Sequence, residues 1–333
     1  MGKEDEEWCF GTAQWQATST GFFCALSRAK EAEQTGTIAT IVTKRKTMGA
    51  KTGKKHVEVI YEDDEILVIN KPSGVSVTKD RTGAAELSEV LGEQPRAERV
   101  RLRLVHRLDK DTSGVMILAK DLRAQTEFSA YFEHRLVAKT YLALVSGPVA
   151  TERGTIDSAL APSPGKTTVM RVVRRGGKEA VTEWELLADF GHVVLLAVHP
   201  LTGRTHQIRV HMASAQMPLA IDPLYGGGTA LFLSDFKQDY RLGKGRSEKP
   251  LIERLTLHAY QIRLPQPQMP ADVVSGASAI QAAISPRRPY YLIAALDKKF
   301  AATIKMLTRH NPKGIQAFIN REHFYRIMNG SRL

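Results

Sequence analysis

The chain has 333 residues, 43% of them hydrophobic and 25% charged, which is typical of a folded globular protein and excludes a wholly disordered chain, a collagen and a coiled coil. The longest apolar run, Val193 to Val198, is far shorter than the roughly 18 residues of a membrane span. Two cysteines, Cys9 and Cys24, are too few for a disulfide scaffold or a four-cysteine zinc site.

The net charge of +12 is unevenly distributed. Residues 1–56 carry nine basic and six acidic side chains, residues 57–265 carry 28 and 26, and residues 266–333 carry ten and three. Basic side chains gain affinity for RNA by releasing phosphate counterions, so a polyanionic partner fits this excess. A net positive charge alone is equally typical of a protein bound to a ribosome, a protein bound to a membrane surface and a highly soluble protein.

Residues 1–56 lack sustained periodicity and are interpreted as a partly irregular N-terminal extension. Their acidic cluster, Glu4 to Glu7, does not fit a transit peptide, and a signal peptide would need a longer apolar stretch near the start. From Val57 onward, short β-branched and apolar runs predict strands, and two longer segments predict helices. The predicted strands are Val57–Tyr61, Glu65–Ile69, Val115–Leu118, Thr140–Val145, Val193–Val198 and Leu255–Leu264, and the predicted helices are Arg123–Leu136 and Thr205–Ala215.

This mixture predicts an α+β domain over 57–265, with a central, mainly antiparallel mixed sheet and flanking helices. Residues 266–280 are rich in Pro, Gly, Ala and Ser, as is typical of a linker. The remainder, 281–333, is interpreted as a basic helical C-terminal extension. Within it, apolar residues spaced by three or four predict an amphipathic helix over Pro289–Leu307, docked on the catalytic body or on RNA.

One polar turn carries a candidate catalytic carboxylate. Asp109 lies between the apolar pair Leu104-Val105 and the predicted strand at Val115, and Gly114 ends the turn. A carboxylate so placed can serve as a nucleophile if a neighbour stabilises its charged form. From spacing alone, a surface loop with an Arg–Asp pair explains the pattern at least as well.

A second stretch, Gly203 to Met212, supplies such a neighbour. Thr205 is a suitable N-cap for the following helix, which places Arg209 one turn in on a rigid element. A guanidinium is always charged and can hold a carboxylate ionised and oriented. The alternative is an exposed helix arginine.

Together, these motifs closely resemble the RluA family of pseudouridine synthases. The resemblance covers roughly 57–265 and rests on segments in a fixed order and spacing. They are His106 to Gly114, Gly203 to His211, Ile69 to Gly74, Lys139 to Val145, Ile221 to Gly227 and Leu257 to Ala259. The resemblance implies a pseudouridine synthase-like catalytic domain. Many members carry an N-terminal S4-type RNA-binding domain, which residues 1–56 do not resemble.

The resemblance also implies roles for individual residues. Asp109 matches the aspartate that attacks a flipped uridine, Tyr141 the tyrosine that stacks on the uracil, and Arg209 the arginine that pairs with the aspartate. Arg107 matches an arginine that fills the gap left by the extruded nucleotide. The other expected members are the framework or phosphate-contacting residues Lys71, Arg204 and His206, and an apolar pocket wall from Leu219 or Ile221.

The implied reaction isomerises uridine in transfer or ribosomal RNA. It needs no cofactor and no metal, because the change is neither a redox step nor a net hydrolysis. The expected partner is RNA, with no membrane and no obligate protein partner, and the family resemblance favours a monomer. We expect a cytoplasmic protein, with nucleus and organelles left open.

Three alternatives compete with this interpretation. A metal hydrolase would use His199, His206, His211 and Asp222 as ligands. However, His206 and His211 are five residues apart and do not share one helix face as an i, i+4 pair does. A glycoside hydrolase would need a second carboxylate, for which Asp111 is a weak candidate. A non-catalytic RNA-binding or ribosome-assembly factor on the same fold is the third, favoured by the basic C-terminal extension.

Overall fold

The computed structural model describes residues 39–41, 57–78, 86–92, 101–237, 240–241, 243, 245–264 and 290–330. The predicted linker 266–280 and nearly all of the predicted N-terminal extension lie outside these residues, so the domain boundaries at 56, 265 and 280 stay predictions. A three-residue strand β1 (Ala39–Ile41) precedes the larger described region. In the described part of the chain, no helix is both long and apolar enough to span a bilayer.

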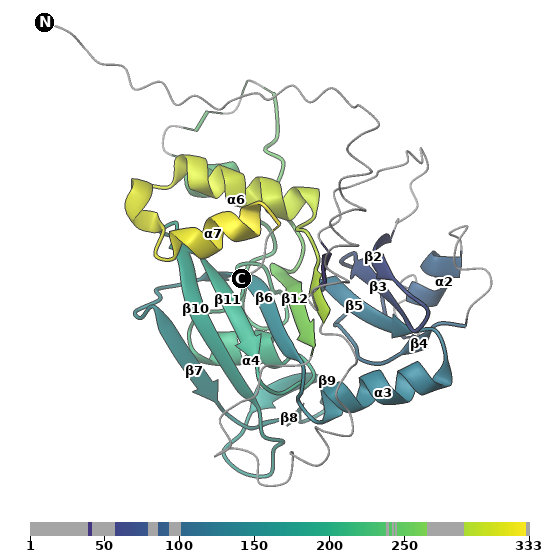
Figure 1. Ribbon diagram of the computed structural model, residues 1–333. Helices are drawn as coiled ribbons and strands as arrows, with labels where there is room; N and C mark the ends of the chain where they lie inside the picture. The colour runs from purple at the N-terminus through teal and green to yellow at the C-terminus, as the bar shows by residue number, and fades with distance from the viewer. Residues whose placement is uncertain are drawn as a thin grey trace, which may run out of the picture. The chain divides into compact units, whose positions relative to one another are not determined.

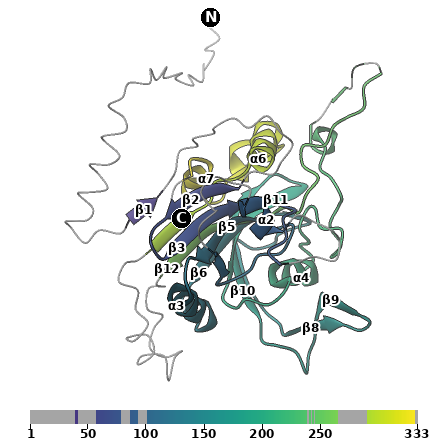
Figure 2. The ribbon, with the colours of Figure 1, turned by 90° about the vertical axis from the view of Figure 1, so that its right-hand side faces the viewer.

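The architecture is a mixed, mostly antiparallel sheet with a few helices, which confirms the predicted fold class. The strands follow the order β2-β3-β5-β12-β6-β11-β10-β7 (Figures 1 and 2). Their bounds are β2 (Glu58–Glu62), β3 (Ile66–Lys71), β5 (Ser113–Ala119), β6 (Ala138–Ser146), β7 (Arg153–Asp157), β10 (Val181–Asp189), β11 (Val193–Pro200) and β12 (Leu257–Leu264). Short strand β4 (Arg103–Leu104) pairs with β5.

All six strand predictions fall on observed strands. Each predicted run is rich in residues that fit a buried sheet, and four of the runs lie in strands (β3, β5, β11 and β12) in which at most one residue is not buried. Between neighbours in the order from β2 to β7, β5 and β12 are parallel and the other pairs are antiparallel. A separate hairpin, β8 (Leu160–Ser163) and β9 (Lys166–Val172), stands apart from this sheet.

The helices are α2 (Leu87–Gly92), α3 (Leu122–Glu133), α4 (Gln207–Ser214), α6 (Lys298–His310) and α7 (Arg321–Met328), with short 3₁₀ turns at Leu233–Asp235 and Gly314–Ala317. Both helices predicted before residue 265 are therefore present. The first turn of α4 differs from the prediction, since the residue before it is His206 in the left-handed region at φ 53°, and no side chain caps it. Thr205 is thus not the N-cap.

The two faces of the sheet have different covers because successive strand side chains point to opposite sides. Leu142 and Leu144 of β6 pack in a cluster with Phe300 and Ile304 of α6. Ala143 and Val145 pack in another cluster, which contains Ile208 and Met212 of α4. Figure 2 shows α4 and the pair α6 and α7 on different sides of the strands. Tyr141 shares the parity of Ala143, so it lies on the α4 side.

The predicted helix over Pro289–Leu307 is wrong in its first half. Tyr290–Ile293 form strand β13, which pairs antiparallel with β12 from Leu264↔Tyr290 to Gln261↔Ile293. Helix α6 begins only at Lys298, where the Asp297 carboxylate accepts hydrogen bonds from the Lys299 and Phe300 amides. From there the amphipathic pattern holds, and Phe300, Ile304 and Leu307 are buried against the sheet. The C-terminal segment therefore completes the core around the main sheet.

Candidate active site

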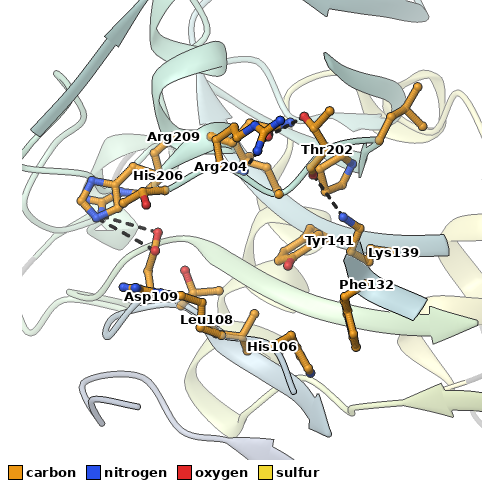
Figure 3. Close-up of a pocket in the computed structure, with 18 of the residues that line it drawn as sticks. His106, Leu108, Asp109, Phe132, Lys139, Tyr141, Thr202, Arg204, His206 and Arg209 are labelled. Atoms are coloured by element: carbon orange, nitrogen blue, oxygen red, sulfur yellow. Dashed lines mark hydrogen bonds and ion pairs between the residues drawn. The ribbon is translucent and has the colours of Figure 1, made fainter. Parts of the chain in front are cut away.

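A cavity of about 520 Å³ lies on the α4 side of the sheet (Figure 3). Its walls come from the turn around Asp109, the end of α3 at Phe132, the start of β6 at Tyr141, and the segment from Pro200 into α4. Segments that lie about 100 residues apart in the chain thus face one another across one space.

The Asp109 turn is braced from both sides. On one side, the backbone carbonyl of Lys110 accepts from the Gly74 amide at 2.9 Å and from Lys71 Nζ at 2.8 Å. On the other, His106 accepts a hydrogen bond from the Ile117 amide at 2.9 Å and stacks on Phe132 with ring centroids 4.2 Å apart. Burial, with a smaller effect of the Lys139 charge, lowers the pKa of His106 to about 3. The ring is therefore a permanent neutral acceptor that fixes the turn.

Gly114 explains why the motif ends in glycine. Its φ is +122°, and a Cβ at this position would stand 2.1 Å from the Ala259 carbonyl oxygen. Gly114 pairs with Ala259 where β5 runs parallel to β12. A side chain here would push the two strands apart and displace the turn that carries Asp109.

Arg209 connects Asp109 to a second carboxylate. Its Nε and Nη2 each donate to Asp222, both at 2.8 Å, while its Nη1 lies 3.9 Å from Asp109 Oδ2. Although burial opposes its charge, the hydrogen bonds and charge of Asp222 raise the pKa of Arg209. The sequence predicted Arg209 as the partner of Asp109, and the structure brings them together, but the bidentate partner is Asp222. This fork, the pair of hydrogen bonds from Arg209 to the two Asp222 oxygens, turns Nη1 toward Asp109.

Tyr141 forms the aromatic wall next to Asp109, as Figure 3 shows. Burial, and to a smaller extent the negative charge of Asp109, raises the pKa of Tyr141 above its ordinary value. The side chain is therefore a protonated phenol near neutral pH. A flat aromatic face beside a carboxylate suits a planar base next to a sugar.

Three further residues predicted to meet RNA, two arginines and a histidine, lie at the cavity. Arg107 is exposed at its rim. Arg204 also lines the cavity and donates from Nε to the Glu179 carbonyl at 2.9 Å. His206 Nε2 lies 4.0 Å from Asp109 Oδ1. The cavity thus presents positive charge around one central carboxylate.

Of the two roles expected for Lys71, framework and phosphate contact, its surroundings favour the first. It is fully buried, and its ammonium donates to the carbonyls of Pro72, Val75 and Lys110. Because these acceptors enclose the charge, Lys71 holds the turn behind Asp109 and we no longer expect it to contact RNA.

The apolar wall of the cavity is not formed by the residues that were expected to supply it. Leu219 and Ile221 are both buried, but they lie in two different clusters of the core and neither lines the cavity. The apolar lining comes instead from Val105, Leu108, Ile208 and Leu257. Residues two apart in an irregular segment give no period from which the directions of their side chains could be read.

The residues of the rival zinc site are engaged elsewhere. His199 Nδ1 lies 3.2 Å from Thr140 Oγ1, His211 lies between Thr182 Oγ1 and the Ser158 carbonyl, and Asp222 holds Arg209. No group of three or more metal-binding side chains occurs among the residues that the structure describes. Asp111, the candidate second carboxylate, is exposed and does not line the cavity.

Sequence reasoning assigned no role to Asp222 or Tyr225 in this site, although both lie in a motif that it quoted. Tyr225 Oη lies 2.7 Å from His206 Nδ1, and its ring lies 5.0 Å from Arg209 Cζ. The signal in the sequence that could have pointed to them was the position of their motif, Ile221 to Gly227, shortly after α4. Spacing alone could not show that this loop folds back onto the helix.

Comparisons with known proteins agree on this region. The family described as RNA pseudouridylate synthase matches residues 65–214. A ribosomal large subunit pseudouridine synthase D from Haemophilus ducreyi is 35% identical over 243 residues, which cover 68% of this chain and 71% of that protein. Its namesake from Xanthomonas campestris is 37% identical over 259 residues, covering 76% and 73%. The solved human RNA pseudouridylate synthase domain containing 4 shares the fold, with a TM-score of 0.52 and 24% identity over 75% of this chain and 92% of that one.

Proposed function

The chain belongs to the RluA family of RNA pseudouridine synthases, and on that premise we propose that it isomerises a uridine flipped out of its RNA, with Asp109 as the nucleophile. The observation that carries the proposal is the arrangement around Asp109. Its carboxylate faces the cavity, 3.9 Å from Arg209 Nη1, and Tyr141 lines the same space.

The proposed chemistry balances within the nucleoside. Asp109 attacks C1′ and the C1′–N1 bond breaks, so that uracil leaves with the electron pair. The base turns, C5 attacks C1′ and displaces the carboxylate, C5 releases its proton to water, and N1, which carries no hydrogen in uridine, takes up a proton from water. No electrons are gained or lost overall, so the chain's own residues need only position, charge and exclusion of water.

The cavity fits the part played by the base. A volume of about 520 Å³ lies in the range of small-ligand pockets, and the face of Tyr141 would hold the freed uracil against escape. Extrusion of a nucleotide costs a few kcal/mol of stacking and pairing, least in a loop or a strained helix. Arg107 at the rim offsets part of this cost by contacting phosphate or stacking.

For the RNA itself, we propose ribosomal RNA of the large subunit. The support is the name of the relatives, which are ribosomal large subunit pseudouridine synthases. Transfer RNA, the other class that the sequence left open, becomes an outcome of the test.

The test is tritium release from RNA labelled at C5 of uridine, because isomerisation detaches that hydrogen. Purified protein is incubated with unmodified large-subunit ribosomal RNA and with transfer RNA in parallel, and Asp109→Asn serves as the inactive control of the same shape. We expect release from ribosomal RNA by the wild type only. Release from transfer RNA alone would overturn the substrate assignment. Tight binding with no release from either RNA would instead support a non-catalytic RNA-binding factor.

A further inference from the structure

His206 bridges Asp109 and a residue with no role in the proposed chemistry. The imidazole precedes α4, with its Nε2 4.0 Å from Asp109 Oδ1 and its Nδ1 2.7 Å from Tyr225 Oη. Figure 3 shows the ring of His206 above the Asp109 carboxylate. Which nitrogen carries the proton therefore decides what faces the carboxylate.

The Tyr225 hydroxyl settles that question by counting hydrogens. Its oxygen already accepts the backbone N–H of Met170 at 2.9 Å, so its single proton needs an acceptor. Among the residues that the structure describes, His206 Nδ1 is the acceptor within reach. Donation from the phenol leaves Nδ1 without a hydrogen, and the neutral ring must then carry its proton on Nε2.

The opposite tautomer is unfavourable at both ends of the ring. A hydrogen on Nδ1 would leave the phenol proton without an acceptor, which costs the desolvation of a half-buried donor. It would also turn the lone pair of Nε2 toward the oxygens of Asp109, so that two acceptors would face each other.

The charge state of the ring makes the tautomer matter. Burial lowers the pKa of His206 below its ordinary value, and the charges of Arg209 and Arg107 act in the same direction, against the opposing effect of Asp109 and Asp222. The imidazole is therefore neutral near pH 7 and has one N–H to place.

We propose that Tyr225 is a positioning residue for the isomerisation: it fixes His206 as the Nε2–H tautomer, whose N–H orients the Asp109 carboxylate toward the flipped uridine. This inference rests on the proposed function. The 4.0 Å separation exceeds a direct hydrogen bond, and catalytic hydrogen bonds often tighten only when substrate is bound. The role differs from the phosphate contact that the sequence allowed for His206.

Three variants separate this role from structural and RNA-binding ones. Tyr225→Phe removes the hydroxyl and keeps the ring over Arg209, whose Cζ lies 5.0 Å from its centre. His206→Gln can place an amide N–H where Nε2 stands, whereas His206→Ala cannot. Both His206 variants meet the same positive φ of 53°, so their backbone strain is matched.

The experiment measures single-turnover tritium release at saturating enzyme, RNA affinity, and the His206 ring by ¹⁵N NMR of histidine-labelled protein, assigned with His206→Gln. We expect a bare Nδ1 in the wild type and a mixture of tautomers in Tyr225→Phe. The release rate in Tyr225→Phe should fall roughly tenfold, the effect of one well-placed hydrogen bond, with RNA affinity unchanged and a small fall in melting temperature because the Met170 amide loses its acceptor. His206→Gln should retain more activity than His206→Ala.

A protonated Nδ1 in the wild type, or a wild-type rate in Tyr225→Phe, would overturn the inference. So would His206 variants that bind RNA more weakly but react at the wild-type rate when saturated, because that result marks a phosphate contact. Absence of release by the wild type would instead overturn the proposed function and with it the catalytic role of the tautomer, while the NMR spectrum would still decide whether Tyr225 fixes the ring.

Discussion

Asp222→Asn tests whether the fork between Arg209 and Asp222 holds the site together. The Asp222 side chain is 1% exposed and that of Arg209 is 8% exposed, so the pair is almost completely removed from water. In Asp222→Asn, the amide nitrogen would face either Nε or Nη2 of Arg209, so that two donors meet at about the 2.8 Å of the present hydrogen bonds. Among the residues that the structure describes, Asp109, 3.9 Å from Nη1, would be the carboxylate left beside the guanidinium.

The magnitude follows from burial. Removing one partner of a buried ion pair costs about 3–5 kcal/mol, because the remaining charge is left without compensation. For a body of this size, that loss lowers the melting temperature by roughly 10 °C. Isomerisation should slow as well, because Arg209 would be drawn onto Asp109 and away from its present orientation.

The assay is urea unfolding at pH 7.5, with tritium release measured on the same preparations. Asp111→Asn is the matched control, since Asp111 is an exposed aspartate of the neighbouring turn that does not line the cavity, and it should change neither quantity. A loss of stability below about 1 kcal/mol in Asp222→Asn, the value typical of a surface pair, would refute the reasoning.

Three further predictions concern the rim, the C-terminal segment and pH. Arg107→Ala, at the exposed rim, should weaken RNA binding and reduce the slope of log affinity against log salt by about one, with no change in melting temperature; an unchanged slope would remove Arg107 from the RNA contact. Phe300→Ala should cost about 3–5 kcal/mol because its side chain is fully buried, whereas the exposed pair Lys305→Glu/Arg309→Glu should leave the fold intact and weaken RNA binding; equal RNA affinity would make α6 a structural brace alone. Burial lowers the pKa of His258 to about 4, so the folded state resists a proton that the unfolded chain takes up near pH 6.5. The contribution of His258 to the free energy of unfolding is therefore complete above pH 6.5, falls by about 2 kcal/mol at pH 5, and continues to fall down to pH 4. Urea unfolding should show a smaller decline for His258→Gln than for the wild type.

The strands were predictable because their signal is local. Each is a run of apolar, β-branched residues ended by Gly, Pro or charged residues, and the same parity that buries Ala143 and Val145 of β6 places Tyr141 at the cavity. The motif glycine was identifiable as well, although its reason is the close approach of Ala259 to Gly114, which only the structure shows.

The C-terminal segment was misread because its first strand has no local signal of its own. Tyr290–Ile293 is four residues long, and Leu292, with Ala295 and Leu296, also fits a helical spacing. Pairing with β12, whose Gln261 lies opposite Ile293, decides for a strand. Deleting residues 281–333 to test RNA binding would therefore also remove part of the core, which is why charge reversal on α6 is the better experiment.

In the site, residue types were predictable but partners were not. The motifs identify Asp109, Tyr141 and Arg209, and all three meet at the cavity. The bidentate partner of Arg209 and the burial of Lys71 depend on loops that return from elsewhere in the chain. A lysine that binds three backbone carbonyls and a lysine that binds phosphate look the same in a sequence.

The central claim is that Asp109 carries the chemistry, and single-turnover isomerisation by Asp109→Asn tests it most directly. Asparagine keeps the shape of the side chain and removes the nucleophilic charge, while the RNA contacts proposed for Arg107 and Arg204 remain. We expect the rate of tritium release at saturating enzyme to fall by about 10⁴-fold or more, as when other enzymes lose their nucleophile, with RNA affinity changed less than about threefold. Release within tenfold of the wild-type rate at equal affinity would contradict the account, because another group would then have to attack the sugar.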